Sequence, residues 1–212
     1  MGIGLALANV FLENGYKVIG SSRSGEIDAI SHPNLEVIKL DLSSFESIEN
    51  AVEILAKRGN IDILINNAGI GPDLDTDLPE KNSFKQTFDV NVTGTVFFTE
   101  LLIELLSKKA AIINISSEMG AIGRCKRFDS VGYRMSKAAL NMYTKILTNR
   151  LEGNLKVASV HPGWVRTSIA ENNISMGRLS PEESAAKIYD FVRSDFKNGI
   201  YWDVESHLEM EW

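Results

Sequence analysis

Residues 61–69 read Ile-Asp-Ile-Leu-Ile-Asn-Asn-Ala-Gly, and this stretch decides the fold prediction for the chain. Its first six residues are almost continuously apolar, which predicts a strand buried on both faces of a parallel sheet. A small polar turn, residues 67–69, follows at once. In an open α/β sheet ligands bind in the crevice outside the carboxyl ends of the strands. Residues 67–69 are therefore predicted to lie at a binding edge.

Strands and helices alternate on both sides of this stretch. Before it we expect a helix over residues 4–14 that stops at Gly15, strands over 17–22 and 35–40, and an amphipathic helix over 44–57. After it we expect a helix over 91–107, a strand over 110–116, a helix over 133–151 and a strand over 156–161. A further helix opens with the capping box at Ser180, and 199–203 is the last predicted strand. The alternation predicts an α/β, doubly wound parallel sheet of the Rossmann type in one domain, residues 1–212.

The first residues, Gly2-Ile3-Gly4, run directly into a helix. In a doubly wound fold the glycine-rich turn after the first, central strand receives a pyrophosphate. Gly2, Ile3 and Gly4 are predicted to end such a turn, with the first central strand absent from this chain. Loss of that strand would leave neighbouring strands with unpaired backbone groups. We therefore expect an incomplete N-terminus, and weak cofactor binding if these residues are the whole molecule.

The amino-acid composition indicates which kinds of binding partner and cellular setting to expect. With 212 residues, 44% of them hydrophobic, the chain has the material for a full core, and its net charge of −6 disfavours nucleic acid. A single cysteine, Cys125, excludes an intrachain disulfide and favours a reducing, cytoplasmic setting. No Cys/His cluster suggests a metal site, and no run of 18 apolar residues suggests a membrane span.

Tyr133 and Lys137 are spaced four residues apart, which places them on one face of a helix. An ammonium beside a phenol favours the phenolate, so we expect Lys137 to lower the pKa of Tyr133 towards neutrality. Tyr133 would then serve as general acid in carbonyl reduction and as general base in alcohol oxidation. Alone, this pattern is common on exposed helices that have no catalytic role.

Two further polar residues extend the pattern. Ser117 ends a predicted strand 16 residues before Tyr133, where it could hydrogen-bond a substrate oxygen. A serine-rich turn without function is the alternative. Asn91 lies near the start or in the interior of the predicted helix 91–107, where an asparagine could also cap the helix or bond nearby backbone.

The ordered motifs GIG, NNAG, NVTG, ISSEMG, YRMSK and HPGWVRT span positions 2–167. This set resembles the short-chain dehydrogenase/reductase family, and within it the carbonyl-reductase branch that includes the C-factor and sniffer proteins. The resemblance implies a catalytic tetrad of Asn91, Ser117, Tyr133 and Lys137. In it Tyr133 exchanges a proton with the substrate oxygen, Ser117 polarises that oxygen, Lys137 binds the nicotinamide ribose, and Asn91 holds a water in a proton relay. The family's first strand and TGxxx segment have no counterpart here, which puts phosphate binding in doubt.

The resemblance also implies a nicotinamide-dinucleotide site. The strand over 17–22 ends at Arg23, and no carboxylate stands there to bond ribose hydroxyls as NAD enzymes require. A guanidinium suits a 2′-phosphate, so NADP(H) is preferred over NAD(H), although Arg23 could be a solvated loop residue. The implied cofactor-binding residues are Gly2, Ile3, Gly4, Arg23, Asp41, Leu42, Asn67, Ala68, Gly69, Tyr133, Lys137, Pro162, Gly163, Val165 and Thr167.

The sequence thus predicts an NADP(H)-dependent oxidoreductase that reduces an aldehyde or ketone to an alcohol. Two alternatives stay open: a 3-oxoacyl or sugar reductase of the same family, and a non-catalytic NADP(H)-binding or signalling protein. The expected partner is a small carbonyl or alcohol substrate, without nucleic acid or membrane. A homodimer through the helices 91–107 and 133–151 is possible in this family.

Overall fold

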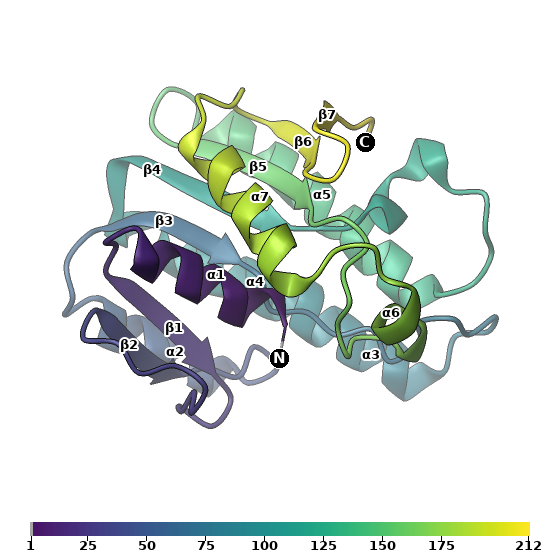
Figure 1. Cartoon of the computed structure of the whole chain (residues 1–212), viewed down its shortest axis with the longest axis horizontal. Coiled ribbons are helices and arrows are strands. Elements are labelled where there is room, and N and C mark those ends of the chain that lie inside the picture. The colour runs from purple at the N-terminus through teal and green to yellow at the C-terminus, as the bar shows by residue number, and fades with distance from the viewer. Residues whose placement is uncertain (1) are drawn as a thin grey trace.

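A computed structural model describes residues 2–212 and shows an α/β fold (Figure 1). Five strands form one sheet in the order β3-β4-β5-β6-β7, and a separate pair joins β1 to β2. The bounds are β1 Val18–Ser22, β2 Leu35–Lys39, β3 Ile61–Asn66, β4 Leu106–Ile115, β5 Lys156–His161, β6 Ile200–Asp203 and β7 Leu208–Glu209. Every pairing is parallel except that of β6 with β7.

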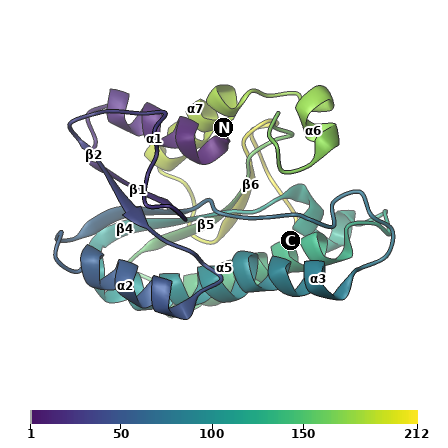
Figure 2. The same ribbon diagram turned by 90° about the horizontal axis from the view of Figure 1, so that it is seen from below.

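Helices cover both faces of the five-stranded sheet (Figure 2). On one side lie α1 (Ile3–Glu13), α6 (Glu171–Met176) and α7 (Pro181–Arg193). On the other side lie α2 (Phe45–Leu55), α3 (Lys81–Phe88), α4 (Thr95–Leu102) and α5 (Val131–Arg150). Each helical layer seals its own apolar core against the sheet: α1 and α7 pack over Ile113 and Val160, and α2, α4 and α5 pack over Ile112 and Val157. The doubly wound prediction is confirmed.

The sheet is divided at the position predicted for a first central strand. β1 hydrogen-bonds β2, β3 hydrogen-bonds β4, and no strand among residues 2–212 lies between β1 and β3. Val18 of β1 and Ile63 of β3 pack instead against the core that α1 and α7 share. Side-chain packing therefore holds the β1–β2 pair to the larger sheet.

Local sequence signals correctly predicted the bounds of several helices and strands. Helix α1 ends where Gly15 adopts a left-handed φ of +82°, as expected of a glycine after the last helical turn. The capping box is present at α7, where Ser180 Oγ accepts from the Glu183 N–H and the Glu183 carboxylate accepts from the Ser180 N–H. The predicted strands over 61–66 and 156–161 match β3 and β5.

The predicted helix over 91–107 has different bounds in the structure. Helix α3 begins ten residues earlier at Lys81, a π-helical turn spans Asp89–Gly94, and α4 ends in a 3-10 turn over Ile103–Leu105. The strand predicted over 110–116 begins earlier as well, because Leu106 already pairs with Ile61 across an irregularity in the ladder. Ser107 is therefore in a strand, and its helical prediction was wrong.

At the C-terminal end of the chain, the prediction of the last strand was also wrong. The strand predicted over 199–203 corresponds to β6, Ile200–Asp203, yet it is not the last strand, because β7 follows and pairs with it antiparallel. A two-residue strand carries too little period to be seen in a sequence. No helix within residues 2–212 joins the length and the apolar character that crossing a membrane requires.

Candidate active site

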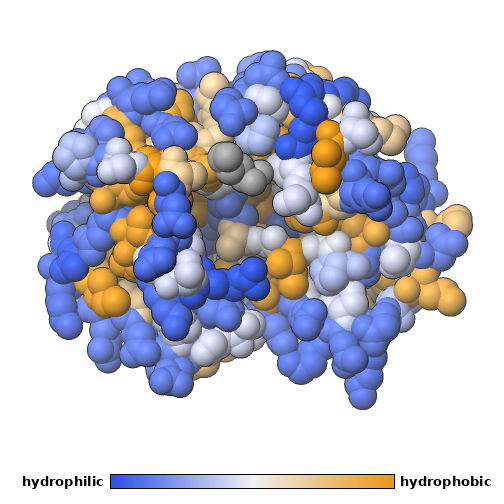
Figure 3. All heavy atoms as spheres, turned by 60° about the horizontal axis from the view of Figure 1, so that its bottom comes forward, coloured by the Kyte–Doolittle hydropathy of each residue, from blue (hydrophilic) through white to orange (hydrophobic). Residues whose placement is uncertain are grey.

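The candidate residues gather at the carboxyl ends of the parallel strands. The molecular face that comes forward in Figure 3 is mostly hydrophilic and is hollowed near its middle. Because parallel strands end at one edge of the sheet, loops distant in the sequence meet there. After β1 comes Arg23; after β2, Asp41 and Leu42; after β3, Asn67, Ala68 and Gly69; after β4, Ser117; and after β5, Pro162, Gly163, Val165 and Thr167.

Helix α5 brings Tyr133 and Lys137 to this edge on one face. Both side chains are buried, with exposed fractions of 8% and 4%. Lys137 Nζ donates a hydrogen bond of 2.9 Å to the Ile115 carbonyl at the end of β4, and it lies 5.6 Å from the centre of the Tyr133 ring. Ser117, two residues beyond Ile115, lies close enough to the Tyr133 phenol for its side chain to favour a lower pKa of that group. Ser117, Tyr133 and Lys137 therefore form one contiguous group.

Asn91 joins this group from the π-helical turn. Its Oδ1 accepts from the Ile70 N–H at 2.8 Å, and its Nδ2 donates to the Ile70 carbonyl at 2.8 Å and to Ser136 Oγ at 3.1 Å. A Cβ added to Gly69 would lie 3.4 Å from both Asn91 Oδ1 and Lys137 Nζ. The two side chains thus flank the same glycine. Asn91 holds the loop after β3 rather than capping a helix.

Burial dominates the electrostatics of the pair on α5. It raises the pKa of Tyr133 to about 12, with a hydrogen bond from Ser117 opposing and the charges on Tyr201 and Asp73 adding to the rise. Burial likewise lowers the pKa of Lys137 to about 8. The expectation that Lys137 lowers the pKa of Tyr133 towards neutrality is therefore wrong for the chain by itself. Removal from water is the largest cause of the shift for both groups.

The start of α1 offers features that suit a phosphate group. Gly2 occupies the N-cap position in extended conformation, and no side chain caps this eleven-residue helix. Uncapped N–H groups at a helix N-terminus attract anions, through hydrogen bonds and through the helix dipole. A Cβ on Gly4 would lie 2.6 Å from Asn67 Nδ2, so glycine lets the Asn67 side chain lie close against the start of α1. Gly2, Ile3, Gly4 and Asn67 thus lie together.

The segment after β5 forms the wall beside α6. Gly163 has a left-handed φ of +81°, and the buried Val165 forms an isolated bridge with Leu179. The indole N–H of Trp164 donates to Asn173 Oδ1 at 3.0 Å, which ties this segment to α6. The loop at the carboxyl edge of the sheet that carries Pro162, Gly163 and Thr167 is therefore held by contacts with Asn173 and Leu179.

Two residues at the site were missed by sequence reasoning. Tyr201 of β6 is fully buried, its hydroxyl donates to the Ser117 carbonyl, and its ring stacks on Trp212 with centroids 5.2 Å apart. Asp73, in the loop after β3, accepts from the backbone N–H of Tyr133. Neither belongs to a motif, and both act across more than 50 residues of sequence, so no local signal could have found them.

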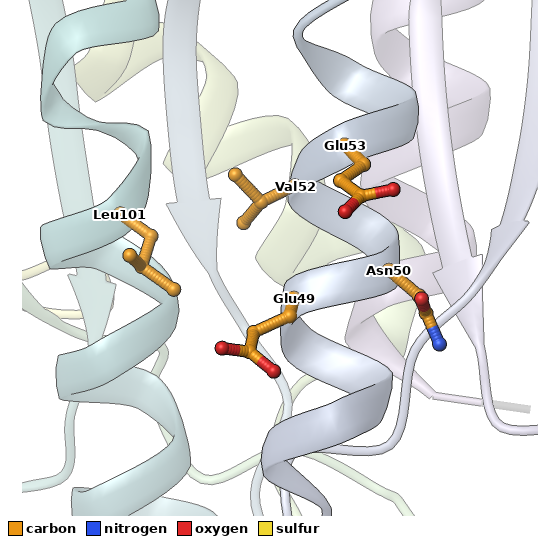
Figure 4. A pocket seen from close by; sticks show the side chains of 5 residues that line it. All are labelled: Glu49, Asn50, Val52, Glu53 and Leu101. Carbon is orange, nitrogen blue, oxygen red and sulfur yellow. The ribbon is translucent and has the colours of Figure 1, made fainter.

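A surface depression lies elsewhere, between α2 and α4 (Figure 4). Its lining contains Leu101 of α4 and Val52, Glu49, Asn50 and Glu53 of α2. In Figure 4 the Glu49 carboxylate points away from the side chains of Asn50 and Glu53, so these polar groups do not converge as they would around a small ligand. None of the candidate catalytic residues lies there.

Comparison with known proteins agrees with this geometry. Residues 1–177 match the profile of a family described as short chain dehydrogenase. An uncharacterized oxidoreductase of Schizosaccharomyces pombe is 30% identical over 96% of this chain and 92% of its own length. A 3-oxoacyl-[acyl-carrier-protein] reductase of Thermotoga maritima is 28% identical over 92% and 87%. The solved structure of an NADPH-bound carbonyl reductase from chicken fatty liver superposes with a TM-score of 0.86 at 26% identity, covering 100% of this chain and 95% of that one.

Proposed function

This chain belongs to the short-chain dehydrogenase family, and from that premise we propose that it is an NADP(H)-dependent reductase of aldehydes or ketones. The observation that carries the proposal is the meeting of Ser117, Tyr133 and Lys137 at the carboxyl edge of the sheet. A general acid needs a proton to give and a donor that holds the receiving oxygen in place. Tyr133 and Ser117 supply these two functions side by side.

The residues present suit a dinucleotide. The uncapped start of α1 presents N–H groups for a pyrophosphate, and Gly4 allows the close approach of the loop at Asn67. Arg23 lies exposed beyond β1, near enough to Asp41 for its charge to lower the pKa of that carboxyl. The first cause of that lowering is the hydrogen bond that Asp41 accepts from the Ser43 hydroxyl. A guanidinium free in solvent can receive a 2′-phosphate.

In the proposed reaction, bound NADPH supplies the hydride that adds to the carbonyl carbon. The Tyr133 hydroxyl gives its proton to the carbonyl oxygen, which balances the charge that develops there. The Ser117 hydroxyl donates a hydrogen bond to the same oxygen. Lys137 would hold ribose hydroxyls of the cofactor, and Asn91, which bonds both backbone groups of Ile70, would keep that loop and a relaying water in place. With a pKa of about 12, Tyr133 is protonated throughout the neutral range, as a proton donor must be.

The direct test is NADPH oxidation by purified protein with a panel of reactive aldehydes and ketones, followed by absorbance. We expect turnover with several of these carbonyls and none without one. The similarity to the 3-oxoacyl-[acyl-carrier-protein] reductase of Thermotoga maritima favours a 3-oxoacyl thioester as a second candidate substrate. Such a thioester is therefore included in the same panel. Tight NADPH binding with no turnover on any member would support the non-catalytic alternative and contradict our proposal.

Arg23→Asp is expected to shift preference from NADPH towards NADH. The substitution removes a charge-assisted contact with the 2′-phosphate and adds a carboxylate that bonds ribose hydroxyls, each an effect of about tenfold or more. The ratio of kcat/KM for the two cofactors measures it. Lys17→Asp is the matched control, because Lys17 is exposed at the other end of β1 and undergoes the same change of charge. An unchanged ratio in Arg23→Asp would contradict the role of Arg23.

Association of two copies stays a prediction, as does the cytoplasmic setting. Helices α4 and α5, the elements expected in a dimer, expose Phe97, Leu101, Met142 and Ile146. Light scattering of the purified protein would decide between one copy and two.

A further inference from the structure

Helix α5 begins without a cap from its own sequence. Ser130 occupies the N-cap position, but it has a left-handed φ of 56° and its side chain makes no capping bond to the helix. Its Oγ accepts instead from the Asp75 N–H at 3.0 Å. The first turn of a helix leaves backbone N–H groups without intrahelical partners, and two of the residues that carry them here, Gly132 and Tyr133, are buried. A partner must come from elsewhere in the chain.

Asp73 supplies that partner from 59 residues away. Its Oδ2 accepts from the Gly132 N–H at 2.6 Å and from the Tyr133 N–H at 3.2 Å, and only 3% of the residue is exposed. A carboxylate here is favoured by the partial positive charge at the start of a 20-residue helix. The second of its two donors is the backbone of Tyr133 itself.

The loop that carries Asp73 is fixed against the helix at several points. The Ser130 N–H donates to the Thr76 carbonyl at 2.8 Å, and Thr76 Oγ1 donates to the Asp73 carbonyl at 2.7 Å. A Cβ on Gly132 would lie 3.0 Å from Asp73 Oδ2, so glycine allows the carboxylate to reach the turn. The carboxylate is thus held in one place rather than resting on the surface.

A neutral side chain could cap this turn equally well, so the charge of Asp73 requires its own explanation. Its second oxygen, Oδ1, is buried and has no hydrogen-bond partner within the described part of the chain. Burying a carboxylate oxygen in this way is costly. Three titratable groups lie near Tyr133: Asp73 from the loop after β3, Lys137 from α5 and Tyr201 from β6. Of these three residues, Asp73 is the one that also hydrogen-bonds the Tyr133 backbone.

We propose that Asp73 is a positioning residue for Tyr133: its carboxylate fixes the first turn of α5 and places a negative charge at the backbone of Tyr133. The inference rests on the proposed role of Tyr133 as proton donor. A negative charge near Tyr133 opposes formation of the phenolate, so it favours the protonated form that a proton donor needs. Burial is the larger cause of the raised pKa of Tyr133, and Asp73 adds to it in the same direction.

Asp73→Ala and Asp73→Asn separate the two effects. In Asp73→Ala the turn loses its anchor, and we expect kcat to fall about tenfold to a hundredfold with a smaller change in KM. In Asp73→Asn the amide oxygen still accepts from both N–H groups, so most of kcat returns. Without the charge, however, the basic limb of its pH profile moves to lower pH. Asp77→Asn, a matched change at an exposed site on the same loop, should alter neither quantity.

Hydrogen exchange at the Gly132 and Tyr133 amides tests the anchor without substrate. Exchange should be faster than wild type in Asp73→Ala and near wild type in Asp73→Asn. Wild-type exchange and kcat in Asp73→Ala would overturn the anchoring role, and an unmoved basic limb in Asp73→Asn would overturn the role of the charge. If Asp73→Ala fails to fold, the basic limb of the pH profile of Asp73→Asn still tests the role of the charge. A wild-type protein that reduced no carbonyl would count against the proposed function, while exchange would still decide the anchor.

Discussion

Tyr133→Phe will abolish carbonyl-dependent oxidation of NADPH, with kcat reduced about a thousandfold or more, as removal of a general acid typically does. The substitution removes one oxygen from a side chain that is already buried against Ser117 and Lys137. Phenylalanine keeps the ring and its packing. The hydride donor is therefore still bound, and what is lost is the proton that must reach the carbonyl oxygen.

Steady-state kinetics with the best carbonyl of the panel measures this loss, and fluorescence titration with NADPH checks that binding is nearly unchanged. The control is Tyr143→Phe, on the same helix, whose hydroxyl donates to Glu100 Oε1 at 2.8 Å far from Ser117. That variant should lose about 1 kcal/mol of unfolding free energy and keep its kcat. Turnover by Tyr133→Phe at the wild-type rate would refute the assignment of Tyr133 as proton donor.

Much of the fold could be predicted because local chemistry and global architecture agree. Residues 61–66 are apolar for long enough to define the strand β3, and Ser180 and Gly15 mark helix ends by hydrogen bonding and by backbone conformation. The order of the motifs predicted the short-chain dehydrogenase family, and the family comparison confirms it.

Other features depended on contacts between distant segments. The π-helical turn over Asp89–Gly94 arises where Asn91 reaches Ile70 and Ser136, two partners at least 21 residues away. The early start of β4 depends on pairing of Leu106 with Ile61. Hydrophobic period alone cannot show either, because both depend on contacts with segments that are distant in the sequence.

The candidate site divides in the same way. Tyr133 and Lys137 could be paired from helical spacing, and Ser117 from its place after a strand. The direction of the pKa shift of Tyr133 could not be predicted from the sequence. Its largest cause is burial, which depends on every element that packs around the side chain. Asp73 and Tyr201 carry no motif, although each contacts a residue that does.

The second large effect concerns Gly94, where the π-helical turn passes into α4. Its φ of −62° and ψ of −44° are helical, so intrinsic preference alone would make alanine about 1 kcal/mol more stable than glycine there. Sterics predict the opposite. A Cβ at this position would lie 2.0 Å from the Leu42 carbonyl oxygen and 2.7 Å from its carbon. Those are backbone atoms, so they cannot rotate away as a side-chain tip could.

Gly94→Ala must therefore separate α4 from the loop after β2, and we expect it to lower the unfolding free energy by about 3 kcal/mol. For a chain of this length that corresponds to a fall in Tm of about 6–12 °C, measured by thermal denaturation. Gly123→Ala is the control, since its Cβ would meet only the tip of Glu211 at 3.8 Å, and it should stay within about 0.5 kcal/mol of wild type. NADPH affinity should fall as well, because the displaced backbone carries Asp41 and Leu42. A Gly94→Ala protein as stable as wild type would mean that helix propensity outweighs the contact, and that the loop after β2 is free to move.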